Sequence, residues 1–116
     1  MTIDILRERL AAARERFERE ALELKDSYLT LQRLAALYED LRVDDRELAD
    51  RILCEWALSE NEGLRFDAEA LIRKFSIKTA VPTLETLEQR LAHSTGAGAP
   101  YERRKVEELI ALLTKE

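Results

Sequence analysis

The sequence predicts an all-α protein with a single domain, 1–116, and its composition gives the main reasons. Leu, Ala, Glu and Arg dominate the chain, whereas it has three glycines and two prolines in 116 residues, which is typical of helices. Hydrophobic residues make up 46% of the chain, enough to form one core. β-Branched residues are few and scattered, so no sheet is expected.

The N-terminal segment, 3–41, has neither glycine nor proline, and its apolar residues recur at helical spacing. One set is spaced by seven residues, as in a heptad seam. Its members are Ile3, Leu10, Phe17, Leu24, Leu31 and Tyr38. We favour one long helix over this segment. A hairpin of two helices is the alternative, because Asp26 and Ser27 are residue types that cap helices well.

A pair of helices is expected over 45–75. The first should run from about Arg46 to Leu58, with an aspartate as its N-cap. It is apolar on most sides, which is typical of a helix buried between others. Trp56 is its largest side chain, so we expect this helix at the centre of the core. The second helix follows a polar turn and should end at about Phe75.

A second pair of helices is expected over 79–114. Pro82 suits the first turn of a helix, where backbone N–H groups lack a helical partner. The glycine-containing stretch 93–99 reads as a flexible connection. A last helix should then run from Pro100 to about Thr114.

The back half of the chain repeats itself weakly. The pattern LRxxAxxL from Leu64 matches ERxxVxxL from Glu102 at an offset of 38, and AxPxL from Ala80 lies between them. These motifs resemble the HEAT-type α-α hairpin repeat over about 45–114, although Val106 stands where that family usually has alanine. The resemblance implies two superhelical hairpins capped by the N-terminal helix or helical hairpin. It also implies a class of proteins that mostly bind other proteins.

The residue types needed for catalysis or metal binding do not gather in recognisable patterns. His93 is the single histidine, and a metal site or a catalytic triad would need companions for it. Cys54 lies in the most apolar segment and reads as a small buried hydrophobe. The acidic run 39–50 lacks the glycine and terminal glutamate of a calcium loop. Nothing near any carboxylate pair predicts a shifted pKa. We therefore expect no enzyme activity, no metal and no cofactor.

The net charge of −5 argues against a nucleic-acid or anionic-membrane binder, which needs surplus lysine and arginine. The N-terminus lacks the basic and apolar regions of a signal peptide, and the longest uncharged stretch, Leu91 to Tyr101, is too short to span a bilayer. A lone cysteine suits a reducing compartment. We expect a cytoplasmic protein.

Two surfaces are candidates for binding another protein. Phe66 should lie nearly opposite the apolar side of its helix, with Arg73 near the same face. It either packs on the neighbouring hairpin or anchors a partner. The acidic run would complement a basic partner. Its candidate contact residues are Asp40, Asp44, Asp45 and Glu47.

The function predicted from these features is a non-enzymatic helical-repeat module for protein–protein interaction. A more specific form is an immunity or antitoxin-like inhibitor of a basic partner. The alternative is a homo-oligomeric scaffold or adaptor subunit that assembles through the N-terminal heptad helix, with a homodimer as the simplest form. The residues expected to mediate self-association are Ile3, Leu6, Leu10, Phe17 and Leu24.

Overall fold

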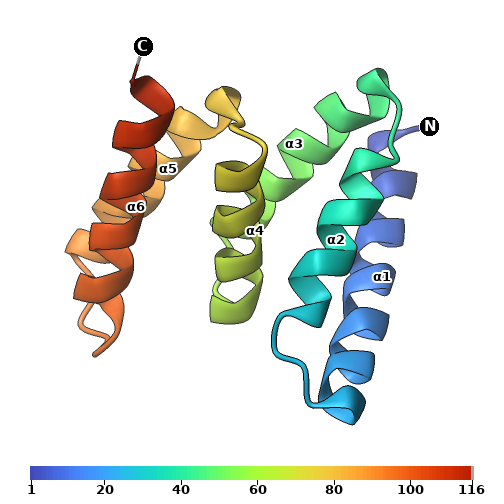
Figure 1. The fold of residues 1–116 in the computed structure, drawn as a ribbon. Helices are drawn as coiled ribbons and strands as arrows, with labels where there is room; N and C mark the ends of the chain where they lie inside the picture. Colours follow the sequence, from blue (N-terminus) through green and yellow to red (C-terminus); the bar gives the residue numbers. More distant parts are fainter. Residues whose placement is uncertain (116) are drawn as a thin grey trace. The chain divides into compact units, whose positions relative to one another are not determined.

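The computed structural model describes residues 1–115, which fold into six α-helices without a β-strand (Figure 1). The helices are α1 (Ile3–Leu24), α2 (Leu29–Glu39), α3 (Val43–Ala57), α4 (Glu62–Lys74), α5 (Val81–Ala92) and α6 (Ala99–Thr114). A 3₁₀ turn, η1 (Lys78–Ala80), precedes α5. The all-α prediction is confirmed. The chain forms two compact units, Met1–Ile52 and the part that starts at Leu53, and α3 crosses from one to the other.

In the first unit, α1 and α2 form an antiparallel hairpin (Figure 1). α1 stops because Lys25 adopts a left-handed conformation, with φ of 52°. The Asp26 N–H then donates to the Ala21 carbonyl at 2.9 Å, and the Lys25 N–H to that of Leu22 at 3.3 Å, which is the Schellman arrangement. The favoured single helix over 3–41 is therefore wrong, and the hairpin alternative is confirmed.

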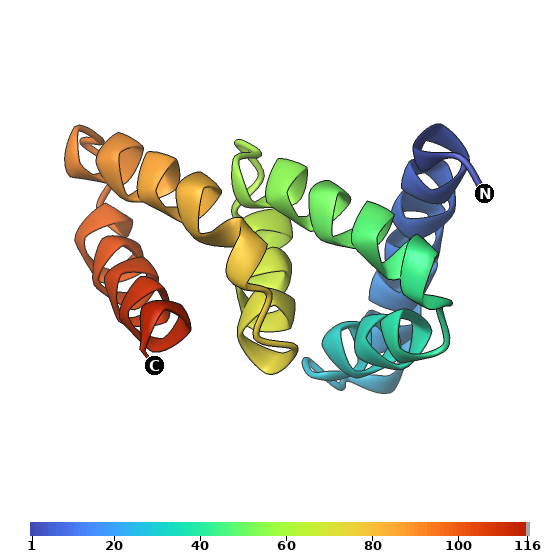
Figure 2. The same ribbon diagram turned by 90° about the horizontal axis from the view of Figure 1, so that it is seen from above.

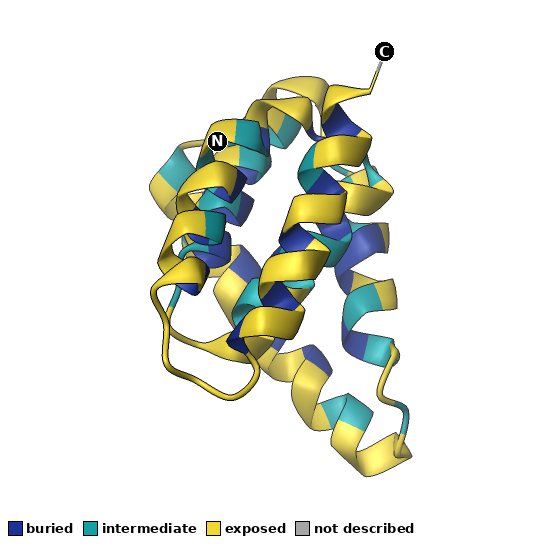
Figure 3. Ribbon diagram, turned by 90° about the vertical axis from the view of Figure 1, so that its left-hand side faces the viewer, coloured by how far each residue is buried: buried dark blue, intermediate teal, exposed yellow. Residues whose placement is uncertain are grey.

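The α1–α2 hairpin buries three of the five residues predicted to mediate self-association. Leu6, Leu10 and Phe17 of α1 are 2%, 6% and 7% exposed, and Leu34 of α2 is also buried. Figure 3 shows the buried residues along one side of each helix and the exposed residues along the other. Because these three side chains of α1 are buried within the chain, they do not need a second chain to cover them.

In the second unit, α5 and α6 lie antiparallel and side by side (Figure 2). Pro82 lies in the first turn of α5, as predicted from its missing N–H. α4 begins at Asn61, whose side chain accepts a hydrogen bond from the Leu64 N–H at 3.1 Å. It ends as α1 does, with Ser76 at a φ of 51° and the Ile77 N–H donating to the Ile72 carbonyl at 3.0 Å.

The core of the second unit is built from one face of each of its helices. Trp56 is 6% exposed, which confirms its prediction as a core residue, and Ala68, Ile72, Leu84 and Val106 are fully buried. Small residues among them, such as Ala68, let helices approach closely. The four helices α3 to α6 match the expected pairs 45–75 and 79–114 in order, while their winding into a HEAT-like superhelix stays a prediction.

We expect replacement of Trp56 by alanine to lower the free energy of unfolding by ~3–5 kcal/mol, because the cavity left by a buried aromatic ring does not collapse fully. Chemical denaturation followed by circular dichroism measures this. Phe66→Ala is the control, because that ring is 42% exposed, and it should cost far less. Since Trp56 is the one tryptophan, native fluorescence should also be blue-shifted. Water-like emission would contradict the assignment.

We expect Lys25→Gly to stabilise the fold by ~0.5–1 kcal/mol, because glycine avoids the steric cost of the left-handed conformation and loses part of that gain to backbone entropy. Glu23→Gly is the matched control, since Glu23 is exposed inside α1, where glycine costs about 1 kcal/mol. Thermal denaturation compares both variants with the parent protein. If Lys25→Gly instead lowered the free energy of unfolding, the left-handed conformation of Lys25 would not carry the expected steric cost.

Candidate partner-binding surfaces and a buried ionic cluster

The strongest concentration of charge lies where α2 ends and α3 begins, and we call residues 39–50 the acidic turn. Six carboxylates and two guanidinium groups here account for −4 of the chain's net charge of −5. Asp44 and Asp45 occupy the first turn of α3, where the helix dipole favours negative charge. The predicted residues Asp40, Asp44 and Glu47 are exposed and Asp45 is half-buried, so the structure brings all four together at one junction.

An exposed apolar side chain lies within the acidic turn. Val43 begins α3 and is 72% exposed. Glu47 lies one helical turn after both Val43 and Asp44, so its side chain neighbours each of theirs on α3. Beside them is a hollow of about 420 Å³, which Met1, Arg42, Asp44, Asp45 and Leu48 line. The acidic turn therefore combines uncompensated negative charge with an apolar contact point.

A polar cluster behind the acidic turn holds α2 against α3. The Tyr38 hydroxyl donates a hydrogen bond to Asp50 at 2.7 Å. The Arg46 guanidinium donates to the Glu39 carbonyl and lies 5.8 Å from the centre of the Tyr38 ring. Burial raises the pKa of Asp50, although the hydrogen bond from Tyr38 opposes this. Arg46 is thus engaged with the backbone and the ring, which leaves Arg42 as the exposed cation among the six carboxylates of the acidic turn.

The second predicted surface lies on α4. Phe66 is 42% exposed, and Arg73, also exposed, lies seven residues later on the same side of this helix. This pair belongs to the second unit, whereas the acidic turn belongs to the first. Aromatic and arginine side chains exposed on the same side of a helix are residue types that often anchor partner proteins.

The residues predicted to mediate self-association differ in how far the structure buries them. Leu6, Leu10 and Phe17 are buried, Ile3 is half-buried and Leu24 is 65% exposed. The three buried side chains are unavailable for a second chain while the hairpin is intact, so the expected continuous seam is not exposed.

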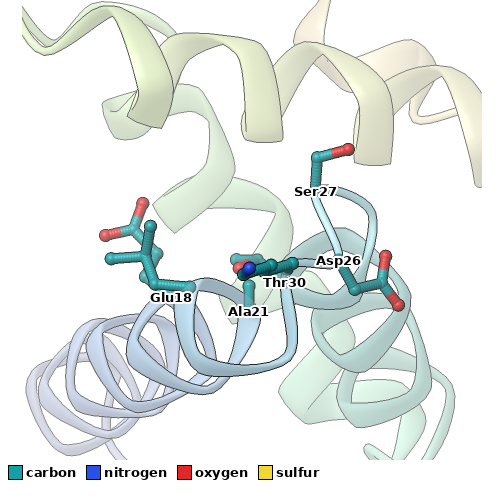
Figure 4. A pocket seen from close by; sticks show the side chains of 7 residues that line it. Glu18, Ala21, Asp26, Ser27 and Thr30 are labelled. Atoms are coloured by element: carbon teal, nitrogen blue, oxygen red, sulfur yellow. The ribbon is translucent and has the colours of Figure 1, made fainter.

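Three apolar side chains are exposed near the tip of the α1–α2 hairpin, and sequence reasoning had named Leu24 alone among them. Leu22, Leu24 and Tyr28 are 80%, 65% and 70% exposed, and we call them the hairpin tip. A hollow of about 530 Å³ adjoins it. Its lining residues are Glu18, Ala21, Leu22, Lys25, Asp26, Ser27 and Thr30 (Figure 4). The signal available in the sequence was the pair of capping residues Asp26 and Ser27, because a helix break at this point creates the hairpin tip.

Sequence reasoning also missed a buried ionic cluster between α4 and α6. Arg65 of α4 donates from Nε and Nη2 to the two carboxylate oxygens of Glu102 on α6, at 2.8 and 2.9 Å. Its Nη1 donates to the Ser59 and Glu60 carbonyls, both at 3.0 Å. The side chains of Arg65 and Glu102 are 15% and 4% exposed. One guanidinium thus ties the turn before α4 to α6, in the bidentate geometry that makes such pairs strong.

A third member of the cluster, Glu69, lies one helical turn after Arg65. Its Oε2 is buried and accepts no hydrogen bond from any of residues 1–115. Burial, followed by the negative charge of Glu102 and hydrogen bonding with it, raises the pKa of Glu69 to about 8, against the opposing charge of Arg65. The sequence alone did not distinguish this pair of carboxyl groups from the other acidic residues of the chain. The pKa shift of Glu69 arises from burial and from contacts with a residue far away in the sequence, which the local spacing of residues does not reveal.

The remaining predicted residues occupy ordinary positions. His93 follows the last residue of α5 and is exposed, while Cys54 is half-buried on α3. Residues 1–115 contain no group of three or more His, Cys, Asp or Glu side chains arranged to hold a metal ion. Within the same residues, every helix is too short or too polar to cross a bilayer.

Comparisons with protein-family models, with curated proteins and with solved structures found no match. The HEAT-like resemblance accordingly rests on the residue pattern alone, and the function is argued below from the surfaces of the chain.

We expect Arg65→Met to lower the free energy of unfolding by ~3–5 kcal/mol, because it leaves a buried carboxylate without its partner. Arg103→Met is the matched control. Arg103 occupies the position equivalent to Arg65 in the sequence repeat and bonds Glu88 at 2.7 Å, but its side chain is 45% exposed. The control should change stability little, since exposed ion pairs contribute little. Equal losses in both variants would contradict the special role of Arg65.

Proposed function

We propose that this chain is a non-enzymatic helical module that binds a basic partner protein through the acidic turn. The observation that carries the proposal is the concentration of −4 charge in residues 39–50, with the exposed Val43 among the carboxylates. Charge of one sign attracts a partner of the opposite sign and accelerates association. An exposed aliphatic side chain supplies the contact that keeps the complex together.

The geometry of the acidic turn supports this use of its charges. Arg46, the nearest half-buried cation, donates to the Glu39 carbonyl, and the partner of Asp50 is the Tyr38 hydroxyl. The exposed carboxylates of Asp40, Asp44 and Glu47 therefore remain available to lysine or arginine side chains. A basic partner would also relieve their mutual repulsion, which is a gain that a neutral partner cannot offer.

Small acidic proteins that block a basic toxin or effector use this kind of charge complementarity, and we propose an immunity or antitoxin-like inhibitor as the specific form of the function. The HEAT-like reading of residues 45–114 fits the same proposal, because helical repeats mostly bind proteins. Phe66 and Arg73 offer a second contact surface on α4.

The test is an affinity capture from a lysate of the source organism with the triple variant Asp40→Asn, Asp44→Asn, Glu47→Gln beside the parent protein. We expect the parent to retain a basic protein, and the triple variant to bind it at least tenfold more weakly, because three charge contacts are removed. Raising the salt from about 50 to 500 mM should weaken the parent complex, as the screening length shortens severalfold.

The matched control is Glu8→Gln, Glu15→Gln, Glu23→Gln, which removes the same charge from three exposed positions of α1. It should retain the partner as the parent does. Equal weakening in both triple variants would mean that net charge alone is responsible. A partner that the acidic-turn variant still binds fully would contradict the proposal.

A homo-oligomeric scaffold remains the second candidate, and the exposed hairpin tip is the observation that favours it. Leu22 and Leu24 are among the most exposed large apolar residues of the described chain, and such side chains are available for contacts with a second chain. Light scattering separates the candidates. A dimeric mass that Leu22→Glu with Leu24→Glu converts to a monomeric one would favour the scaffold, whereas a monomeric parent protein favours the binding module.

A further inference from the structure

The ionic cluster of α4 and α6 has one cation for two carboxyl groups. A guanidinium carries five N–H donors, and Arg65 directs four of them to Glu102 and to the two carbonyls of the preceding turn. At most one N–H donor of Arg65 therefore remains for Glu69. The cluster is thus balanced in charge when Glu102 alone is ionised, and it carries an excess negative charge when Glu69 ionises as well.

The buried oxygen of Glu69 points to the same imbalance. Its Oε2 accepts no hydrogen bond from residues 1–115, and an ionised carboxylate cannot donate one. A proton on Glu69 turns this group into a donor, for which the carboxylate of Glu102 is the acceptor at hand. Protonation thereby satisfies the buried oxygen and removes the repulsion between the two carboxylates in a single step.

The charged groups around the cluster come from few elements. On α4, Arg65 acts on Glu69 directly, and Glu62 acts on Arg65. On α6 the acting group is Glu102. The turn before α4 contributes backbone carbonyls, and Arg90 of α5 is directed at the Leu58 carbonyl at 3.5 Å. No second cation among residues 1–115 donates a hydrogen bond to Glu69, so its ionisation is compensated by Arg65 alone.

We infer that Arg65, Glu69 and Glu102 form a pH-operated clasp, which holds α6 against α4 while the two carboxyl groups share one proton and loosens when that proton leaves. The inference goes beyond the proposed binding function and does not depend on it. Since Glu102 is bonded to Arg65 in both states, the clasp loosens without opening fully. Release of the proton lowers the protection of α6 and leaves the α1–α2 hairpin unaffected.

The direction of the effect follows from the pKa of Glu69, which is about 8 in the folded chain against an ordinary value of 4.5. Below pH 4.5 the group is protonated in both states, and its stabilising contribution is fully present. Between these values the unfolded chain ionises while the folded one holds its proton, so the equilibrium constant for unfolding rises up to about tenfold per pH unit. Above pH 8 the folded form ionises too, and this loss levels off.

The test is to measure hydrogen-exchange protection factors of α6 amides in the full chain at pH 6 and pH 9, with the carboxyl titration of Glu69 followed by carbon NMR. Protection factors already correct for the pH dependence of intrinsic exchange. We expect α6 protection to fall about tenfold or more across this range in the parent protein, and Glu69 to titrate well above an ordinary glutamate.

Three variants make the test specific. Glu69→Gln keeps the shape and the hydrogen-bonding capacity without the titration, so its α6 protection should be the same at both pH values. Glu102→Gln leaves Glu69 as the sole carboxylate for Arg65, so the pKa of Glu69 should fall and the pH dependence should weaken. Glu85→Gln, at an exposed position on α5, is the control and should behave like the parent.

Two results would overturn the inference. One is titration of Glu69 at an ordinary glutamate pKa in the parent protein, which can be read even if a variant fails to fold. The other is an equal fall of α6 protection in the parent and in Glu69→Gln, which would assign the pH dependence to another group. Asp50, whose pKa is also raised, lies in the first unit and contributes equally to both proteins.

Discussion

The position of α6 depends on how one guanidinium distributes its hydrogen bonds. Arg65 bonds the two carbonyls that end the α3–α4 turn and, at the same time, both oxygens of Glu102. Glu102 is 4% exposed, and an ionised group so deeply buried is tolerated only with a partner. Val106 and Leu109 contribute apolar burial to the packing of α6, and the bidentate ion pair adds a directional contact to it. The pair thus supplies orientation and the apolar core supplies most of the free energy.

Arginine side chains serve the same purpose elsewhere in the chain. Arg46 donates to the carbonyl of Glu39 at the end of α2, and Arg90 donates to that of Leu58 just after α3. The carbonyl groups at the end of a helix lack helical partners, and a nearby cation both bonds them and complements the helix dipole. These guanidinium groups are consequently drawn towards the backbone. In the acidic turn, Arg46 is bonded in this way, and the six carboxylates there still outnumber the two guanidinium groups.

Much of the fold could be read from the sequence, because apolar spacing located the helices of the back half to within a few residues and Trp56 was correctly placed in the core. The break at Lys25 could not be assigned with certainty, since left-handed helix ends usually carry glycine and both ends of this kind here carry lysine or serine. Of the candidate sites, the acidic turn was visible as local charge density. The clasp was not, because Arg65 and Glu102 lie 37 residues apart and only folding makes them neighbours.

The hairpin tip has a consequence for how this protein responds to the choice of salt. Sulfate is excluded from protein surfaces and strengthens contacts between apolar groups, while any added ion screens charges. Contacts made by Leu22, Leu24 and Tyr28 should therefore tighten in ammonium sulfate, while contacts made by the acidic turn should weaken in sodium chloride of the same ionic strength. Added sulfate should therefore act in opposite directions on contacts made by the hairpin tip, which it strengthens, and on contacts made by the acidic turn, which it screens.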